Sequence, residues 1–377
     1  NRARCAMGCS RLALRATVLG SVYTHQINIM ILNEAEREKR RSHYQEPRPS
    51  DGLGDGVLFL RSIYLGLDEH PSVTDFHLHS KAEQEADQRE ADEMKKKFRG
   101  SGHDEADVLE AMLNVEIDRS EWFGALTSRT TFYDDLKGTD AVLEWDEKER
   151  FGFVPRLLVD VTSSSQQEKI DEKLKKLDEG RDVKYVRSQV DVDRHGQGNE
   201  MALKKIPIVI LGIDKNLVEG LGQYAITFSQ ERNGKQSMDR KAFAEHPLKI
   251  LLLEQALIQV DRQIRQEVAR LAQELINVKD IPELNEVIET YNKLMKETEP
   301  PTVDQIIEAF EPVQNKIRQL YKIESIVSIL NRWRNLRAIY ILLLEKREEN
   351  EKTASTRLTD QWRSSSETHR LLTREAA

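Results

Sequence analysis

The sequence predicts an α+β fold, in which a mixed sheet flanked by helices is followed by an all-α C-terminal region. Residues 139–145 and 156–162 are short, apolar and rich in β-branched side chains, and a polar stretch with a glycine and a proline separates them, so both are predicted strands. The most apolar run of the chain, 206–213, predicts a fully buried strand. From Arg240 onward the apolar residues recur only with helical spacing.

Composition narrows the class of protein. The 377 residues suffice for about two domains of ~150 residues each. A net charge of −8 argues against a protein coated with basic surface for nucleic acid, although it leaves room for a local basic groove. The two cysteines, Cys5 and Cys9, provide neither a disulfide framework nor a zinc ribbon. No run reaches the ~18 apolar residues of a membrane span, so we expect a cytoplasmic protein with no membrane partner.

The first 100 residues carry little predicted structure. Residues 1–33 contain four arginines and no acidic residue. A targeting peptide and a start at Met30 both remain open, and we expect the segment 1–33 to be a disordered or non-native tail. Residues 34–100 form a charged linker and helix, in which an apolar patch at 57–67 is either a strand or a docking segment.

The predicted core spans residues 101–242 and begins with a helix from Asp104 to about Val115. Besides the strands above, it has a first strand at 126–133, a helix at 166–177, a strand at 183–192 and a helix at 217–226. The helical region, 243–349, has predicted helices at 246–278, 282–297, 302–322 and 323–350. Residues 350–377 are polar, and we expect them to be disordered.

Each of the two central strands carries an aspartate within an apolar run. Because side chains alternate along a strand, Asp140 shares a face with Val142 and Glu144, and Asp160 shares one with Thr162. A carboxylate among aliphatic residues is costly unless it is paired or bound to a cation. Two of them on neighbouring strands therefore predict a cup for a divalent metal ion.

These residues resemble the restriction-endonuclease-like superfamily, the PD-(D/E)XK nucleases. That pattern has a helix with a glutamate, a strand with an aspartate, a strand ending in acid-x-lysine, a helix and a further strand. Asp140 corresponds to the first acid, Asp160 to the second, and Glu110 or Glu105 to the helix acid. The likeness covers about residues 104–226, which also resemble uncharacterised bacterial proteins of that fold.

The resemblance implies a restriction-endonuclease-like mixed sheet and a Mg²⁺- or Mn²⁺-dependent nuclease acting on DNA or RNA. Asp140, Asp160 and the backbone carbonyl of Val161 would be metal ligands. Glu110 would be a general base, or it would position the metal ligands without touching the metal. In such enzymes the metal polarises the scissile phosphate and activates water.

One position departs from the pattern. Thr162 stands where the family has its lysine, and a threonine cannot supply that cation. Lys169 or Lys173 on the following helix borders the sheet and could turn toward Asp160, and Lys184 on the next strand is a third candidate. The competing hypothesis is a catalytically inactive nuclease-fold scaffold or interaction protein that forms homo-oligomers through its C-terminal helices. The acidic net charge favours this second hypothesis mildly.

Two further motifs favour ordinary structural roles. Asp75-Phe-His77-Leu-His79 resembles the first motif of the PHP phosphoesterases, but the other histidines are isolated in sequence, so we interpret the match as a coincidence of surface residues. The basic aromatic stretch 332–337 could line a nucleic-acid groove. We favour a core Trp333 whose neighbouring arginines are solvated or paired with Glu324 and Glu345. No phosphate-binding loop and no nucleophile triad is legible.

Overall fold

The structure is a computed structural model, and the chain divides into two compact units, 1–53 and 54–377. The described residues all lie in the second unit and are 54–64, 70–98, 104–175, 177, 180–192, 198–232, 235–238, 243–277, 289, 293, 305, 324–352 and 356–374. The expected tail 1–33 lies outside the described residues, as do the predicted helices 282–297 and 302–322 apart from three single residues. No helix in the described ranges combines the length and the apolarity needed to cross a bilayer.

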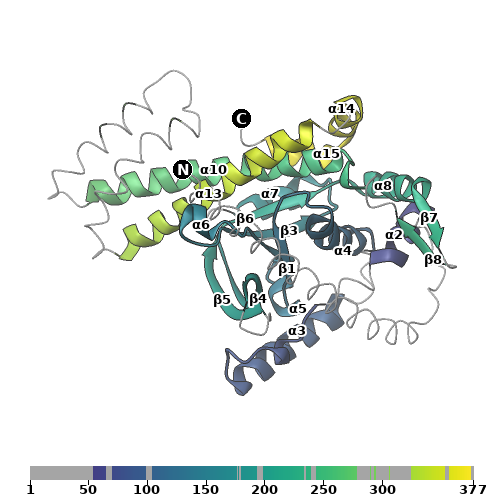
Figure 1. The fold of residues 1–377 in the computed structure, drawn as a ribbon. Coiled ribbons are helices and arrows are strands. Elements are labelled where there is room, and N and C mark those ends of the chain that lie inside the picture. The colour runs from purple at the N-terminus through teal and green to yellow at the C-terminus, as the bar shows by residue number, and fades with distance from the viewer. Residues whose placement is uncertain are drawn as a thin grey trace, which may run out of the picture. The chain divides into compact units, whose positions relative to one another are not determined.

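A four-stranded mixed sheet forms the centre, as Figure 1 shows. Its strands, in spatial order, are β1 (Leu126–Arg129), β2 (Ala141–Glu144), β3 (Arg156–Thr162) and β6 (Ile208–Gly212). β2 is antiparallel to β1 and to β3, whereas β6 is parallel to β3. All residues of β2 and β6 are buried, which accounts for their continuous apolar character. The predicted α+β class with a mixed sheet and a C-terminal helical region is therefore present.

Helices and a hairpin cover the sheet. α4 (Asp104–Arg119) packs on β1 and β3. On one face, α7 (Gln167–Lys175) joins a core cluster with residues of β2, β3, β6 and the hairpin of β4 (Arg181–Val192) and β5 (Gly198–Ile206). Leu158 of β3 belongs to this cluster, so the residues two and four positions further along β3 also face α7.

Two segments of the core differ from the sequence prediction. The apolar patch at 57–67 is helical and not a strand as far as it is described, because residues 57–64 belong to α2 (Asp55–Tyr64) and residues 65–67 lie outside the described residues. Val57, Leu60 and Tyr64 are buried at helical spacing, and α2 packs against α8 (Lys215–Thr227). β5 was not predicted because polar and charged residues interrupt its apolar ones and only Leu203 is buried. The short pair β7 (Ser229–Arg232) and β8 (Lys235–Met238) was not predicted either.

The edge of β6 is closed by a ladder of glutamine side chains from α10 (Leu248–Asn277). Gln255 and Gln259 each bond both backbone groups of one strand residue, Gly212 and Ile210 respectively, at 2.8–3.0 Å. Gln263 donates to the carbonyl of Ile208 at 2.9 Å. Four helical residues rise ~6.0 Å and two strand residues ~6.6 Å, so the two repeats match. The amides thus satisfy backbone groups that an edge strand otherwise leaves open.

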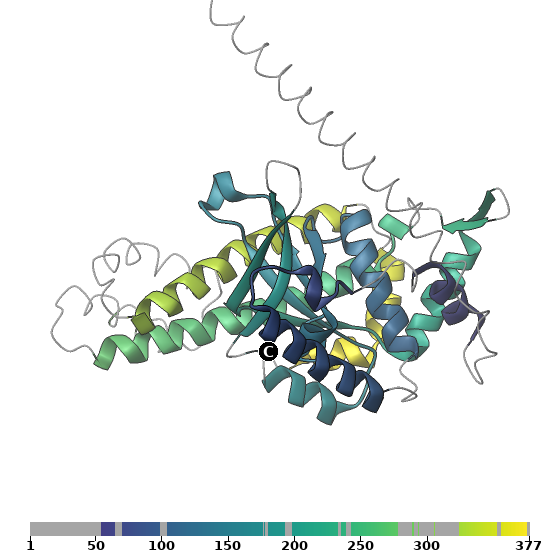
Figure 2. The ribbon, with the colours of Figure 1, turned by 90° about the horizontal axis from the view of Figure 1, so that it is seen from below.

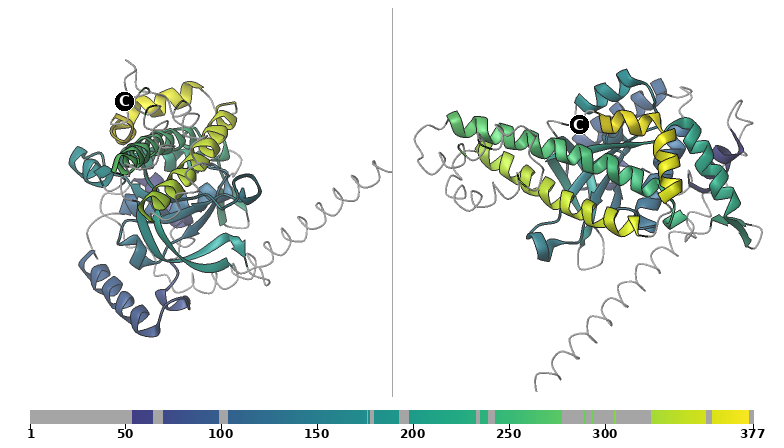
Figure 3. Two further views of the ribbon diagram at one scale, coloured as in Figure 1. Left: turned by 90° about the vertical axis from the view of Figure 1, so that its left-hand side faces the viewer. Right: turned by 90° about the horizontal axis from the view of Figure 1, so that it is seen from above.

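The C-terminal residues 356–374, which the sequence predicts to be disordered, form α14 (Thr356–Ser365) and α15 (Glu367–Arg374). Most of their residues are polar, but Leu371 and Leu372 are buried in the core cluster that α7 joins. α13 (Glu324–Glu351) precedes them and runs side by side with α10 in the opposite direction (Figures 2 and 3).

A buried histidine at the start of α10 makes the stability of the fold dependent on pH. The Nδ1 atom of His246 accepts the N–H of Leu248 at 3.1 Å, and its ring lies edge-on to Tyr224 and Trp362. Burial lowers the pKa of His246 to about 3. Between about pH 6.5 and pH 3, His246 is therefore protonated in the unfolded chain and neutral in the folded chain.

We therefore expect the free energy of unfolding to fall as the pH drops from about 6.5 toward 3, by up to about 1.4 kcal/mol per pH unit for this group. His246→Asn keeps an acceptor for the N–H of Leu248. It should reduce the slope of the unfolding free energy against pH by the contribution of one proton. Urea unfolding at pH 7, 6, 5 and 4 measures it, with the exposed His77→Asn as control. Equal slopes in all three proteins would contradict the assignment.

Candidate active site

The two predicted aspartates lie side by side on neighbouring strands. Ala141 pairs with Val159, and continuing that antiparallel register by one residue places Asp140, just before β2, opposite Asp160. Both side chains are buried, with 5 % and 4 % exposure. The N–H of Val161 donates to Asp140 Oδ2 at 2.5 Å. The sheet therefore brings together the two acids that the sequence singles out.

A lysine from the helix after β3 reaches Asp160. Lys173 of α7 forms an ion pair with Asp160 Oδ1, and its Nζ also donates to the carbonyl of Val161 at 3.2 Å. Of the other candidate lysines, Lys169 is exposed and Lys184 donates to Asp87 at 2.5 Å. Lys173 is thus the lysine that supplies a cation at Asp160.

The helix acid of the site is Glu110. Its Oε1 lies 2.5 Å from Arg129 Nη2, and Arg129 Nη1 donates to the carbonyl of Asp140 at 2.7 Å. Glu105, the alternative, pairs instead with Lys215 at 3.1 Å. Burial and the nearby charges of Glu110 and Asp160 raise the pKa of Asp140 well above its usual range.

Asp135 is a fourth carboxylate of this group, and sequence reasoning assigned it no role. It ends the short helix α5 (Phe132–Asp135), and its carboxyl group interacts with the Asp140 side chain. Burial and the charge of Glu110 raise the pKa of Asp135 to about 7. Its neighbour Asp134 points elsewhere, because it accepts the backbone N–H groups of Lys184 and Tyr185 at 2.9 and 3.0 Å.

Three cationic side chains oppose these carboxylates. Besides Arg129 and Lys173, Arg181 of β4 places Nη2 3.9 Å from Asp160 Oδ2. The Nη1 atom of Arg181 donates to the carbonyl of Lys137 at 2.6 Å, which anchors the guanidinium beside the site. Four carboxylates with three cationic side chains beside them leave the negative charge of the group only partly compensated, and such groups with shifted pKa values are candidate functional sites.

His70 also belongs to the site. Its Nε2 lies 2.8 Å from Arg129 Nη2 and 3.6 Å from Asp135 Oδ2. Burial, followed by the charge of Arg129, lowers the pKa of His70 to about 3, so the imidazole is neutral. His70, Glu110 and Asp135 form a group whose ligand atoms all lie within 4.8 Å of one another. Nothing in the isolated position of His70 in the sequence indicated this.

The predicted metal ligands are all engaged by protein groups. Asp140 accepts from the N–H of Val161, Asp160 contacts Lys173 and Arg181, and the Val161 carbonyl accepts from Lys173. Neither Asp140 nor Asp160 belongs to the group of three around His70.

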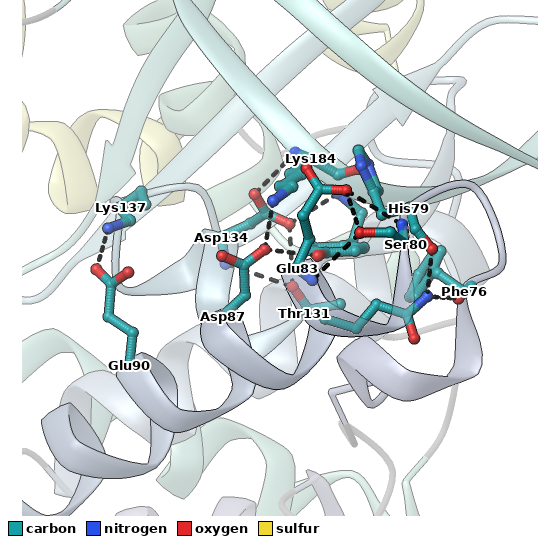
Figure 4. Close-up of polar contacts among 12 residues, drawn as sticks. Phe76, His79, Ser80, Glu83, Asp87, Glu90, Thr131, Asp134, Lys137 and Lys184 are labelled. Carbon is teal, nitrogen blue, oxygen red and sulfur yellow. Dashed lines mark hydrogen bonds and ion pairs between the residues drawn. The ribbon is translucent and has the colours of Figure 1, made fainter.

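The helix α3 (Lys81–Phe98) packs against α5, which carries Asp135, and Figure 4 shows polar contacts of α3. Asp87 of α3 accepts from Lys184 Nζ and from the Tyr185 hydroxyl, both at 2.5 Å. His79 Nε2 donates to the carbonyl of Lys184 at 3.2 Å, and His77 is exposed. His77 is therefore a surface residue, as the sequence interpretation of that motif expected, whereas His79 is half-buried and bonded to the backbone.

The basic aromatic stretch 332–337 has a core role. Trp333 is buried, and Arg332 is buried with Nη1 3.0 Å from Glu267 Oε1. Of the two expected acidic partners, Glu345 pairs instead with Arg150 at 2.8 Å, and the side chain of Glu324 lies outside the described part of the chain. Arg332 and Trp333 are therefore not free to line a groove.

The site is thus defined by its geometry: carboxylates from α4, α5, the start of β2 and β3, with a lysine from α7 and arginines from β1 and β4. Comparison of the chain with family models, with curated proteins and with solved structures finds no match.

Proposed function

We propose that this protein is a metal-dependent nuclease that hydrolyses phosphodiester bonds of DNA or RNA, on a restriction-endonuclease-like core. The observation that carries the proposal is the contact of Lys173 with Asp160. This lysine comes from the helix after β3 and supplies the cation that Thr162 cannot. The chain order of α4, β2, β3, α7 and β6 also agrees with the pattern of that superfamily.

The chemistry of the donor set suits a hard divalent cation. Carboxylate and carbonyl oxygens from Asp140, Asp160 and Val161 are the ligand types of Mg²⁺ and Mn²⁺. The raised pKa of Asp140 marks a carboxylate whose negative charge its surroundings compensate incompletely. A bound cation would polarise the scissile phosphate and lower the pKa of a water molecule.

The protein's own side chains have separate tasks in this proposal. The ammonium of Lys173 donates to the attacking water or to a phosphate oxygen, and its pairing with Asp160 fixes its position. Arg181 adds positive charge beside Asp160, where charge develops on the phosphate. Glu110 accepts a proton from water or holds Arg129 in place.

Lysine substitutions on α7 test this assignment. We expect Lys173→Met to lower the cleavage rate at least about 100-fold, because it removes a positioned proton donor and positive charge. Lys175→Met, at an exposed position of the same helix, should leave the rate unchanged. Lys169→Met tests the alternative lysine.

The assay uses single- and double-stranded DNA and RNA with Mg²⁺, Mn²⁺ or chelator, and circular dichroism checks the fold of each variant. Cleavage that survives in Lys173→Met, or that continues with chelator present, would remove the proposed mechanism.

A second candidate is the catalytically inactive scaffold. The observation in its favour is that Arg129, Lys173 and Arg181 already contact the acidic group, so protein cations provide part of the compensation that a metal would give. This candidate predicts no cleavage by the wild-type protein under any of these conditions. It also predicts that about 5 mM Mg²⁺ leaves the melting temperature unchanged. A Mg²⁺ ion that bound only the folded state would raise the melting temperature.

A further inference from the structure

A second cation position lies beside the aspartate pair. His70, from the segment before α3, meets Glu110 of α4 and Asp135 of α5, and one ligand atom of each lies within 4.8 Å of the others. All three side chains keep partial exposure, between 18 % and 23 %, so an ion can reach them from solvent. One imidazole with two carboxylates is a donor set suited to transition metals, because imidazole is a softer ligand than oxygen.

The imidazole of His70 is oriented as a metal ligand is. Its Nδ1 lies 3.1 Å from the carbonyl oxygen of Thr130. Because a carbonyl only accepts, Nδ1 carries the hydrogen and Nε2 presents its lone pair. That lone pair is on the side of Asp135, whose Oδ2 lies 3.6 Å from Nε2. Ligating histidines are commonly held in this way, by donation from the other ring nitrogen to a carbonyl.

An arginine holds the place between two of the three ligands. Arg129 Nη2 lies 2.8 Å from His70 Nε2 and 2.5 Å from Glu110 Oε1. A lone pair and a carboxylate that converge on one point require positive charge there, and the guanidinium provides it. The other end of the fork, Nη1, donates to the carbonyl of Asp140 at 2.7 Å and would keep Arg129 near the site if Nη2 moved away.

We propose that His70, Glu110 and Asp135 form a site for a transition metal ion, Mn²⁺ or Zn²⁺ in preference to Mg²⁺, and that the bound ion displaces Nη2 of Arg129. The inference goes beyond the nuclease proposal, with which it shares Glu110, because it concerns a separate ligand set with nitrogen in it.

Manganese spectroscopy on the full chain tests the site. Mn²⁺ bound to the wild type should show coupling to ¹⁴N in pulsed electron paramagnetic resonance. His70→Gln should lose that coupling and bind Mn²⁺ at least about 10-fold more weakly. His79→Gln, a histidine held by the carbonyl of Lys184, is the matched control and should retain both. Coupling that persists in His70→Gln, or no coupling in the wild type, overturns the proposal.

Two further variants cover the case in which His70→Gln fails to fold. Asp135→Asn should keep the ¹⁴N coupling, because the imidazole remains. It should weaken the binding of Mn²⁺ at least about 10-fold, because one carboxylate ligand is lost. Arg129→Gln should tighten Mn²⁺ binding several-fold, since the competing guanidinium is gone. Affinities for Asp135→Asn and Arg129→Gln equal to that of the wild type would contradict the ligand set and the competition, respectively.

The nuclease proposal and this one fail separately. Asp160→Asn removes a ligand of the proposed nuclease site but none of the three ligands here, so its ¹⁴N coupling should match the wild type. A wild type that cleaves with Mg²⁺ but shows no coupling with Mn²⁺ defeats only the histidine site. Coupling without any cleavage defeats only the nuclease.

Discussion

Asp160→Asn should abolish phosphodiester cleavage, with a loss of at least about 1000-fold, or on the order of 4 kcal/mol of transition-state stabilisation. The substitution keeps the volume of the side chain but removes its charge. Asp160 lies opposite Asp140 and pairs with Lys173 and Arg181, so one change weakens both the proposed metal ligand set and the positions of two cations. Single-turnover cleavage of labelled oligonucleotides measures the effect.

The same substitution should not unfold the protein. Asp160 is one of the charges that raise the pKa of Asp140, so a neutral residue in its place relieves repulsion between the two strands. We therefore expect the metal-free melting temperature to stay near the wild-type value. Asp146→Asn, at an exposed position just after β2, is the matched control and should cleave normally. Equal cleavage by both variants would exclude Asp160 from the chemistry.

Gln259→Leu should destabilise the protein strongly, by about 2–6 kcal/mol. Leucine fills a similar space but can neither donate nor accept. The N–H and the carbonyl of Ile210, each bonded to Gln259 at 2.8 Å, would then be buried without a partner. Each lost partner costs ~1–3 kcal/mol. Urea unfolding monitored by circular dichroism gives the free energy of unfolding.

Gln273→Leu provides the comparison for Gln259→Leu. Gln273 is exposed on the same helix, so its replacement tests the general effect of leucine in α10 without touching β6. We expect it to change the free energy of unfolding by less than about 0.5 kcal/mol. A similar loss in both variants would mean that the amide contacts with β6 contribute little.

The central strands could be predicted because local pattern decides them. β3 and β6 are buried on both faces, so their aliphatic runs are unambiguous. The two aspartates were visible because a charge in such a run is unusual. The lysine was predicted only as a choice of three, since helix and strand geometry is needed to show that Lys173 reaches Asp160.

What could not be predicted depends on long-range contacts. Asp135 and His70 join the site only through the packing of α5 and of the segment before α3, and neither has a sequence spacing that relates it to Asp140. The C-terminal helices are polar on most of their surface, and their order comes from two leucines and from Thr368, which donates to Asp214. Composition alone therefore predicted disorder there.

The contacts of α10 with β6 also restrict which amino acids evolution can use at these positions. Gln255 and Gln259 each need an acceptor and a donor at the end of a three-carbon side chain; glutamate lacks the donor, and asparagine is too short. A distant homologue that keeps this helix should therefore conserve Gln-x-x-x-Gln-x-x-x-Gln after a buried strand, even where the residues of the candidate site differ. A search for this pattern is a way to find homologues of this chain that overall sequence similarity does not detect.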